Sequence, residues 1–361
     1  MTHPDGGFYS AEDADSVIDP ANPEQKGEGA FYIWSIGELS RLLEPPARDW
    51  FGYAYGVEPD GNVANDPQGE FTAKNILFED HTAEETAAKF GVAVEEVRSA
   101  LEGARARLLA ERSKRVRPHL DDKILTGWNA LMISAFAKGA QILDDTRYRD
   151  AAVRATAFLL RHLYIPDTGI LLRRFRDGEA AIDGFLDDYA FFIQALLDLY
   201  ETVFQPYYLE LAVHLTGTML ERFEDSELGG LFSTADGEPG LIVRMKDDYD
   251  GAEPSGNSVA ADVLLRLARF TERADFSAAA ERIFRAFAGR IDAAPAGVPQ
   301  LLAALLRFLA ASRQVVVVGD IDSRDTQGML RAVRRRFLPN TGVLLVDSDE
   351  TRDTLQRYAA A

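Results

Sequence analysis

Paired aspartates recur along the chain beside aromatic and amide residues, and they are the side chains most able to do chemistry. The pairs are Asp121-Asp122, Asp187-Asp188 and Asp247-Asp248. Two carboxylates that face each other across a polar cavity can act as general acid and base on a sugar. We therefore take as candidate catalytic residues Asp122, Asp188, Asp247 and Asp248.

Residues that could bind a sugar follow or precede these pairs. Sugars stack on aromatic rings and form hydrogen bonds with carboxylates, amides and lysine, and each of these types is present. The candidate binding residues are His119, Lys123, Trp128, Asn129, Tyr189, Tyr249, Glu253 and Asn257. His119 is included because it alone among the five histidines lies beside a pair.

A structural role for the same aspartates stays open at this point. Asp is a preferred N-cap residue, and a carboxylate near a helix N-terminus stabilises the helix without any catalytic duty. In each pair we expect one aspartate to cap a helix and the other to remain free. Asn257 could likewise be a capping residue, and Trp128 could belong to the core.

A further acidic cluster near the start consists of Glu12, Asp13 and Asp15. Clustered carboxylates can hold Ca²⁺ or Mg²⁺, but this spacing lacks the glycine and the distal glutamate of an EF-hand loop. We interpret it as a solvated loop and expect no metal. The sequence has no HExxH, P-loop or GxSxG motif, so we also expect no cofactor.

Composition excludes several classes of function. With 39 Lys plus Arg against 58 Asp plus Glu, the net charge of −19 disfavours nucleic-acid binding. The basic stretches at residues 105–117 and 331–336 have the spacing of solvated helix faces. The absence of cysteine excludes disulfides and thiol chemistry within these residues. No apolar run could span a membrane, so we expect a cytoplasmic protein.

A repeat of about 60 residues indicates how the aspartates are positioned. A glycine turn at residues 168–171 recurs at 229–232, the Asp177-Gly178 turn recurs at Asp236-Gly237, and Asp187-Asp188-Tyr189 recurs at 247–249. A further Gly-Gly-aromatic turn lies at residues 5–9. Three motifs in one register predict a repeated structural unit, with the aspartates at the start of its first helix.

Helices of two kinds alternate between these turns. The segments that are apolar almost all round, typical of buried helices, are residues 128–143, 185–200, 258–270 and 298–310. The mixed or amphipathic segments, typical of outer helices, are residues 148–163, 207–223 and 276–291. Stacked helical pairs form an open solenoid or a closed, double-layered α/α toroid. The apolar first helix of each pair favours the toroid.

Short β elements complete the predicted mostly α fold. Residues 169–176 and 241–245 are β-prone runs beside Asp-Gly hairpin signals, and residues 31–34 are β-prone as well. Residues 313–361 read as strand, helix and strand, a βαβ unit without the glycine-rich loop of a nucleotide site. We therefore predict a partial α/α toroid over residues 1–312, irregular over 1–127, with a βαβ appendage over 313–361.

Four long motifs resemble the YyaL/spermatogenesis-associated protein family. They lie at residues 6–16, 121–131, 185–190 and 253–260, although Ala130 stands where the family is expected to have glycine. The resemblance implies a six-hairpin α/α toroid, related to N-acylglucosamine 2-epimerases and several glycosidases, joined to a thioredoxin-like N-terminal domain.

The same resemblance implies that this chain is an internal part of a longer protein. The thioredoxin-like domain, the first helical pairs and a cysteine-containing tail are not in it, so Met1 would not be the natural start. An incomplete toroid would expose an apolar seam, which predicts self-association.

Three functional hypotheses follow. The first is a toroid that binds or acts on a carbohydrate, with paired aspartates as acid and base in a glycosidase-like reaction; an epimerase-like reaction of this fold class would rely on histidine, and only His119 is placed for it. The second is a binding or scaffold module that serves a redox reaction of the thioredoxin-like domain. The third is a non-catalytic relative, which would be favoured if helix N-termini bind the aspartate carboxylates entirely.

Overall fold

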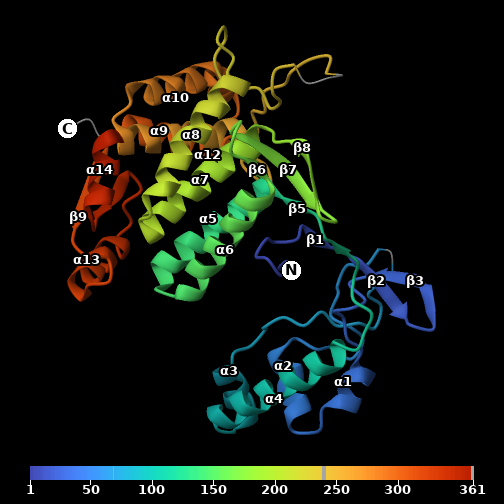
Figure 1. The fold of residues 1–361 in the computed structure, drawn as a ribbon. Coiled ribbons are helices and arrows are strands. Elements are labelled where there is room, and N and C mark those ends of the chain that lie inside the picture. The colour runs from blue at the N-terminus through green and yellow to red at the C-terminus, as the bar shows by residue number, and fades with distance from the viewer. Residues whose placement is uncertain (68, 238–240, 359–361) are drawn as a thin grey trace. The chain divides into compact units, whose positions relative to one another are not determined.

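The computed structural model describes residues 1–67, 69–237 and 241–358, and the chain divides into two compact units (Figure 1). One unit is Ala11–Asp121; the other combines Met1–Ser10 with Asp122–Ala361. The predicted domains were residues 1–312, irregular over 1–127, and residues 313–361. In the structure the first ten residues and the C-terminal βαβ unit group with the helices, and residues 11–121 form a unit of their own.

The larger unit has two layers of helices. The inner helices, each packed against the next along the chain, are α5 (Thr126–Leu143), α7 (Leu186–Val203), α9 (Gly256–Thr271) and α12 (Pro299–Leu309). The outer helices, each packed on the inner helix before it, are α6 (Thr146–His162), α8 (Pro206–Phe223) and α10 (Ala274–Ala286). A short helix, α11 (Ala288–Ala293), follows α10.

The predicted fold class is confirmed: three α/α hairpins and the first helix of a fourth form a partial toroid in the described residues. The apolar periodicity explains the two layers. In α7, side chains on all sides are buried, including Phe191, Phe192 and Leu196, so the helix must lie inside. In α10 the buried side chains, such as Phe276 and Ile283, follow a single face.

A β-hairpin connects the first two helical pairs, as predicted. Strand β7 (Ile170–Arg176) pairs with β8 (Glu179–Asp183) through a turn at Asp177 and Gly178. Both turn residues have positive φ, 52° and 79°, which is the geometry of a tight hairpin turn. β7 also pairs with β5 (Ile124–Leu125) and β6 (Tyr164–Ile165).

The predicted strand at residues 241–245 was wrong. These residues form no strand, and the side chains of Ile242, Val243 and Met245 are exposed. A β-prone run needs a paired partner and a face to bury, and this run has neither among the described residues. The segment is held instead by a hydrogen bond from the Ser233 amide to the Met245 carbonyl, and by the Arg244 guanidinium, which donates to the carbonyls of Thr234 and Arg222.

The C-terminal βαβ unit is present as predicted. Strands β9 (Arg313–Val318) and β10 (Thr341–Val346) pair in parallel, and α13 (Arg324–Arg334) connects them. Helix α14 (Asp349–Tyr358) follows β10. β9 and β10 pack on α9, and β10 also packs on α7. Because of these contacts, the βαβ unit belongs to the larger compact unit.

The smaller unit has its own core. It contains the hairpin of β2 (Asp15–Asp19) and β3 (Asn22–Glu28), with β1 (Ala11–Glu12) paired to β4 (Leu120–Asp121). Its helices are α1 (Ile36–Leu42), α2 (Ala47–Ala54), α3 (Ala83–Phe90) and α4 (Val94–Arg112). The predicted β-prone run at 31–34 contributes only a bridge between Trp34 and Asn75.

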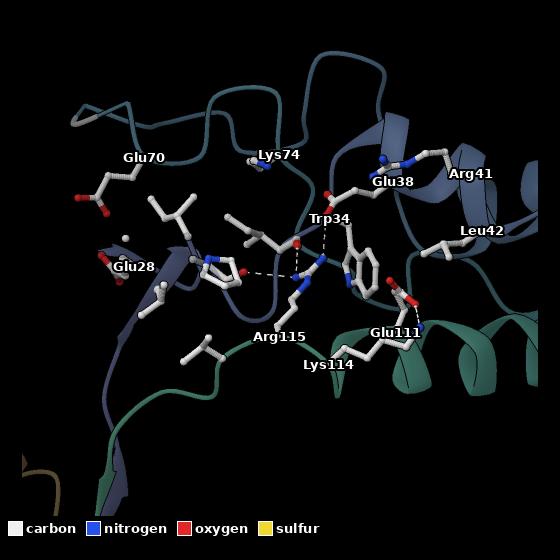
Figure 2. A pocket seen from close by; sticks show the side chains of 17 residues that line it. Glu28, Trp34, Glu38, Arg41, Leu42, Glu70, Lys74, Glu111, Lys114 and Arg115 are labelled. Atoms are coloured by element: carbon white, nitrogen blue, oxygen red, sulfur yellow. Dashed lines mark hydrogen bonds and ion pairs between the residues drawn. The ribbon is translucent and has the colours of Figure 1, made fainter. Parts of the chain in front are cut away.

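Two capping boxes and one arginine organise this unit. Ser35 with Glu38 caps α1, and Thr82 with Glu85 caps α3. Figure 2 shows Arg115 over the Trp34 ring, 4.1 Å from its centroid, with an ion pair to Glu38. Arg115 also donates to the carbonyls of residues 30, 31 and 33. Among the described helices, none is long and apolar enough to cross a membrane.

Candidate functional site

The N-terminal ends of the inner helices bring together several of the candidate residues. Asp188 is the central one, with 1% of its surface exposed. One of its oxygens accepts from the Gly127 amide of α5 at 2.9 Å, and the other from the Phe185 amide at the start of α7 at 3.0 Å. Helix N-termini carry unsatisfied amides, so Asp188 caps two helices at once.

Arg173 of β7 completes this cluster. Its guanidinium lies 2.7 Å from Asp188 and 3.1 Å from Asp187. Burial, and then the charge of Asp187, raises the pKa of Asp188 to about 7, while Arg173 and the two amides oppose that rise. A carboxyl group with such a pKa could exchange protons near neutrality. Asp187 is the more accessible carboxylate, with 28% of its side chain exposed.

Trp128 and Glu253 link the first and third repeats at this end. The Trp128 indole N–H donates to a Glu253 carboxylate oxygen at 3.1 Å. Trp128 lies in the first turn of α5, and Glu253 just precedes α9. With 48% of its surface exposed, the Trp128 side chain is not part of the core. The hydrogen bond therefore fixes an aromatic ring that solvent can reach.

Three other candidate residues hold the glycine turns. Asn129 accepts from the Phe8 amide at 2.7 Å and donates to its carbonyl at 3.0 Å. Asn257 makes the same pair of bonds with Leu231, both at 2.8 Å. The Tyr189 hydroxyl accepts from the Leu171 amide at 3.0 Å. All three side chains are buried, so none offers a surface to a ligand.

The remaining aspartates have separate partners. Asp122 forms an ion pair with Arg176 at 2.8 Å. Asp248 lies 3.6 Å from Arg290, and Asp247 accepts from the Tyr249 amide at 3.2 Å.

The Asp247-Asp248 pair ends eight residues before α9 begins at Gly256. The prediction that all three pairs lie at the start of an inner helix was therefore wrong for the third pair. It was wrong for the first pair as well, because Asp121 belongs to β4 and Asp122 precedes α5 by four residues. Tyr249 is exposed in the same segment, and Lys123 lies between β4 and β5.

His119 and the acidic cluster lie in the other unit. Glu12 pairs with Arg117 at 2.6 Å and accepts from the Tyr32 hydroxyl at 2.8 Å, and both contacts lower its pKa. Asp13 donates its amide to the His119 carbonyl and accepts from the Asp15 amide. Within the described residues, no group of three potential ligands could hold a metal ion.

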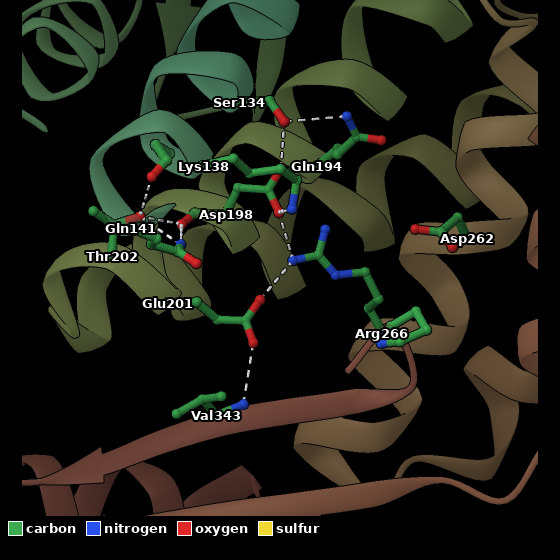
Figure 3. Close-up of polar contacts among 12 residues, drawn as sticks. Ser134, Lys138, Gln141, Gln194, Asp198, Glu201, Thr202, Asp262, Arg266 and Val343 are labelled. Atoms are coloured by element: carbon green, nitrogen blue, oxygen red, sulfur yellow. Dashed lines mark hydrogen bonds and ion pairs between the residues drawn. The ribbon is translucent and has the colours of Figure 1, made fainter. Parts of the chain in front are cut away.

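A buried polar network on the inner helices escaped the sequence analysis (Figure 3). Asp198 of α7 is fully buried and pairs with Arg266 of α9 at 2.7 Å and with Lys138 of α5 at 2.9 Å. Ser134 also donates to Asp198. The available signal was the presence of Asp198 and Arg266 among the buried side chains of α7 and α9. Arg173 was missed because its role depends on the fold of β7.

Comparison with known proteins finds relatives along nearly the whole chain. The chain is 37% identical to human spermatogenesis-associated protein 20 over 97% of its length, and 36% identical to the mouse protein. An uncharacterized protein of Caenorhabditis elegans is 35% identical, also over 97% of this chain. The chain spans about half the length of these relatives, 46% to 50%. No protein-family model matches.

The solved structures that are similar to this chain at low sequence identity include sugar enzymes. D-mannose isomerase is 14% identical with a TM-score of 0.41, over 63% of this chain and 67% of that one. Cellobiose 2-epimerase from Spirochaeta thermophila DSM 6192 is 17% identical with a TM-score of 0.38, over 46% of this chain and 43% of that one.

Proposed function

The chain belongs to the spermatogenesis-associated protein 20 family, and we propose that its helical unit binds a carbohydrate at the N-terminal ends of the inner helices. Trp128 is the stacking surface in this proposal. Glu253 and Asp187 are the carboxylates that accept hydrogen bonds from sugar hydroxyls.

The fixed and exposed Trp128 ring is the observation that carries the proposal. Burying so large an apolar side chain is favourable, and yet nearly half of Trp128 remains in contact with water. Its hydrogen bond to Glu253 holds the ring in one orientation. A fixed aromatic face with carboxylates beside it suits a sugar ring, which has apolar faces and polar edges.

The geometry favours binding over catalysis by Asp188. Both Asp188 oxygens accept backbone amides, and its surface is almost entirely covered. An acid or base must reach the proton that it transfers. Among the carboxylates of this cluster, Asp187 is the one that a ligand can approach.

A thermal-shift screen of the whole chain against mono- and oligosaccharides tests this proposal. A ligand that binds only the folded protein raises its Tm by mass action. We expect a saccharide to raise Tm for the unaltered protein and for Glu253→Gln, which retains an acceptor for the indole. We expect the shift to vanish in Trp128→Ala.

Tyr207→Ala is the matched control, because Tyr207 is an equally exposed aromatic residue at the start of α8. That variant should respond to saccharide like the unaltered protein. If no saccharide shifts Tm, or if Trp128→Ala keeps the shift, the proposed site is wrong.

The capped state of Asp188 also supports a second candidate function, a binding or scaffold module without its own catalysis. In this proposal the reacting groups lie in a thioredoxin-like domain of the longer family members. The chain has no cysteine and cannot itself perform thiol chemistry. A thiol-dependent activity of the longer protein that disappears when the helical unit is removed would support this function over the first.

A further inference from the structure

A cavity in the helical unit carries an excess of positive charge. It has a volume of about 520 Å³ and is bounded by the inner helices α5, α7, α9 and α12 and by the βαβ unit. Six basic side chains line it: Lys138, Arg266, Arg269, Arg307, Arg334 and Arg336. The acidic lining residues are Glu201 and Asp262. This local excess is unexpected in a chain with a net charge of −19.

Part of this charge is neutralised within the buried network (Figure 3). Arg266 contacts Asp198 at 2.7 Å and Glu201 at 2.9 Å, and Lys138 contacts Asp198 at 2.9 Å. Burial opposes the ionised form of Asp198, but attraction to Arg266 and Lys138 prevails and lowers its pKa. These two cations and two carboxylates therefore balance one another.

The other cations are not all balanced. Arg307 pairs with Asp262 at 2.7 Å. Among the described residues, Arg269, Arg334 and Arg336 have no carboxylate within ion-pair distance. Three guanidinium groups thus line one cavity without a direct ion pair. Carboxylates attract them only from farther away, Glu201 and Asp262 in the case of Arg269 and Asp144 and Glu201 in the case of Arg334.

The surroundings of two of these arginines show that they are desolvated as well. Burial, and then repulsion from Arg307 and Arg266, lowers the pKa of Arg269 to about 10. Burial lowers the pKa of Arg334, whose guanidinium donates to the carbonyls of Glu201 and Thr202. Buried charges are normally paired, so an anion in the cavity would relieve a cost that the protein otherwise bears.

We propose that this cavity binds a small ligand through a phosphate or carboxylate group, which Arg269, Arg334 and Arg336 hold. Arginine suits this role because its planar fork of N–H donors matches the oxygens of either group. The site is distinct from the Trp128 surface, and it joins elements of the toroid to the βαβ unit. That unit then has a function as one wall of a binding site.

Isothermal titration calorimetry of the whole chain at constant ionic strength measures anion affinity and tests this proposal. The probes are inorganic phosphate, glucose 6-phosphate and glucuronate, with uncharged glucose for comparison. We expect an anion to bind and glucose not to bind. Binding of phosphate and glucose 6-phosphate identifies a phosphate site, whereas binding of glucuronate alone identifies a carboxylate site.

The variants Arg269→Gln and Arg336→Gln should each weaken anion binding by about tenfold or more, the usual loss for a charged hydrogen bond. Arg336 is exposed, so its variant should fold even if Arg269→Gln does not. Arg331→Gln is the matched control: it lies on the same segment but pairs with Asp144 at 3.3 Å and is not among the cavity's lining residues.

The Arg331→Gln control should bind the anion as the unaltered protein does. The proposal is overturned if none of the three anions binds at concentrations up to about 10 mM. It is equally overturned if a folded Arg336→Gln protein binds with unchanged affinity.

Discussion

Asp187 and Asp188 are adjacent in sequence and occupy opposite environments. Successive helical residues point in directions about 100° apart. The first turn of α7 therefore directs Asp188 toward α5 and leaves the Asp187 side chain partly exposed to solvent. Asp188 accepts the Gly127 and Phe185 amides, and Asp187 reaches Arg173 and solvent. One aspartate caps and the other remains approachable, as the pair was expected to behave.

The raised pKa of Asp188 predicts a pH-dependent stability. Its folded-state pKa of about 7 lies above the ordinary value near 3.8, so the folded protein binds more protons between these values. Stability from this group should therefore be fully present below about pH 4 and decline as pH rises toward 7, by up to about 4 kcal/mol. Urea unfolding from pH 5 to pH 8 measures this decline.

Asp188→Asn provides the comparison, because asparagine cannot ionise. The variant loses an acceptor and should be less stable at pH 5, but its stability should fall less between pH 5 and pH 8 than that of the unaltered protein. Parallel pH profiles of the two proteins would show that Asp188 does not titrate in this range.

The sequence identified the important positions at this end of the helices but not their roles. The residue types and their spacing in the sequence indicated that Asp188, Asn129, Asn257 and Tyr189 matter at this end of the helices. Whether such a residue meets a ligand or a backbone amide depends on contacts with segments far away in the sequence, such as Phe8 for Asn129. No local pattern contains that information.

Glycines set the spacing of the inner helices. A side chain at Gly127 would meet Asp188 Oδ1 at 3.1 Å, and one at Gly256 would meet Leu186 Cγ at 2.8 Å. Each glycine stands at the N-terminal end of its helix, facing α7. The close approach is what lets Asp188 of one helix accept the amide of another.

Gly256→Ala should therefore destabilise the helical unit by about 1–3 kcal/mol, the cost of forcing a methyl group into a packed contact. Gly217→Ala in α8 is the matched control, because a Cβ there has open space. It should be neutral or stabilising by up to about 1 kcal/mol, since alanine is the better helix former. Denaturant unfolding measures the free energy of unfolding of both variants. Equal changes in the two would show that a methyl group at residue 256 meets no packed contact.

Elements with a strong periodicity were predictable, and those that need a partner were less so. The buried and amphipathic helices were predicted close to their observed bounds because each pattern is local. The strand at 241–245 failed because pairing depends on another segment. The third aspartate pair lies away from α9 because the linker between the turn at Leu231 and that helix is longer than the corresponding linker before α7.

At the scale of the molecule, the smaller unit is an insertion in the first repeat. Asn129 on α5 holds the Phe8 turn as Asn257 on α9 holds the Leu231 turn. Between Phe8 and α5, however, lie residues 11–121 with a separate core. The second repeat has the β7–β8 hairpin between its turn and its inner helix. Self-association through an exposed seam of the incomplete toroid stays a prediction.

An insertion with adjacent ends should be removable. The chain enters the smaller unit at Ala11 and leaves it at Asp121, and these residues are paired in antiparallel strands, about 5 Å apart. Replacing residues 12–120 by two glycines should therefore leave the larger unit folded, with a cooperative helical unfolding transition in circular dichroism. A shortened protein without a cooperative transition would show that the larger unit depends on the insertion for its stability.

The two units should also unfold separately in the whole chain, because Leu101 and Leu196 are buried in different cores. Leu101→Ala should lower the free energy of unfolding of the smaller unit only, and Leu196→Ala that of the larger unit only, each by about 2–5 kcal/mol.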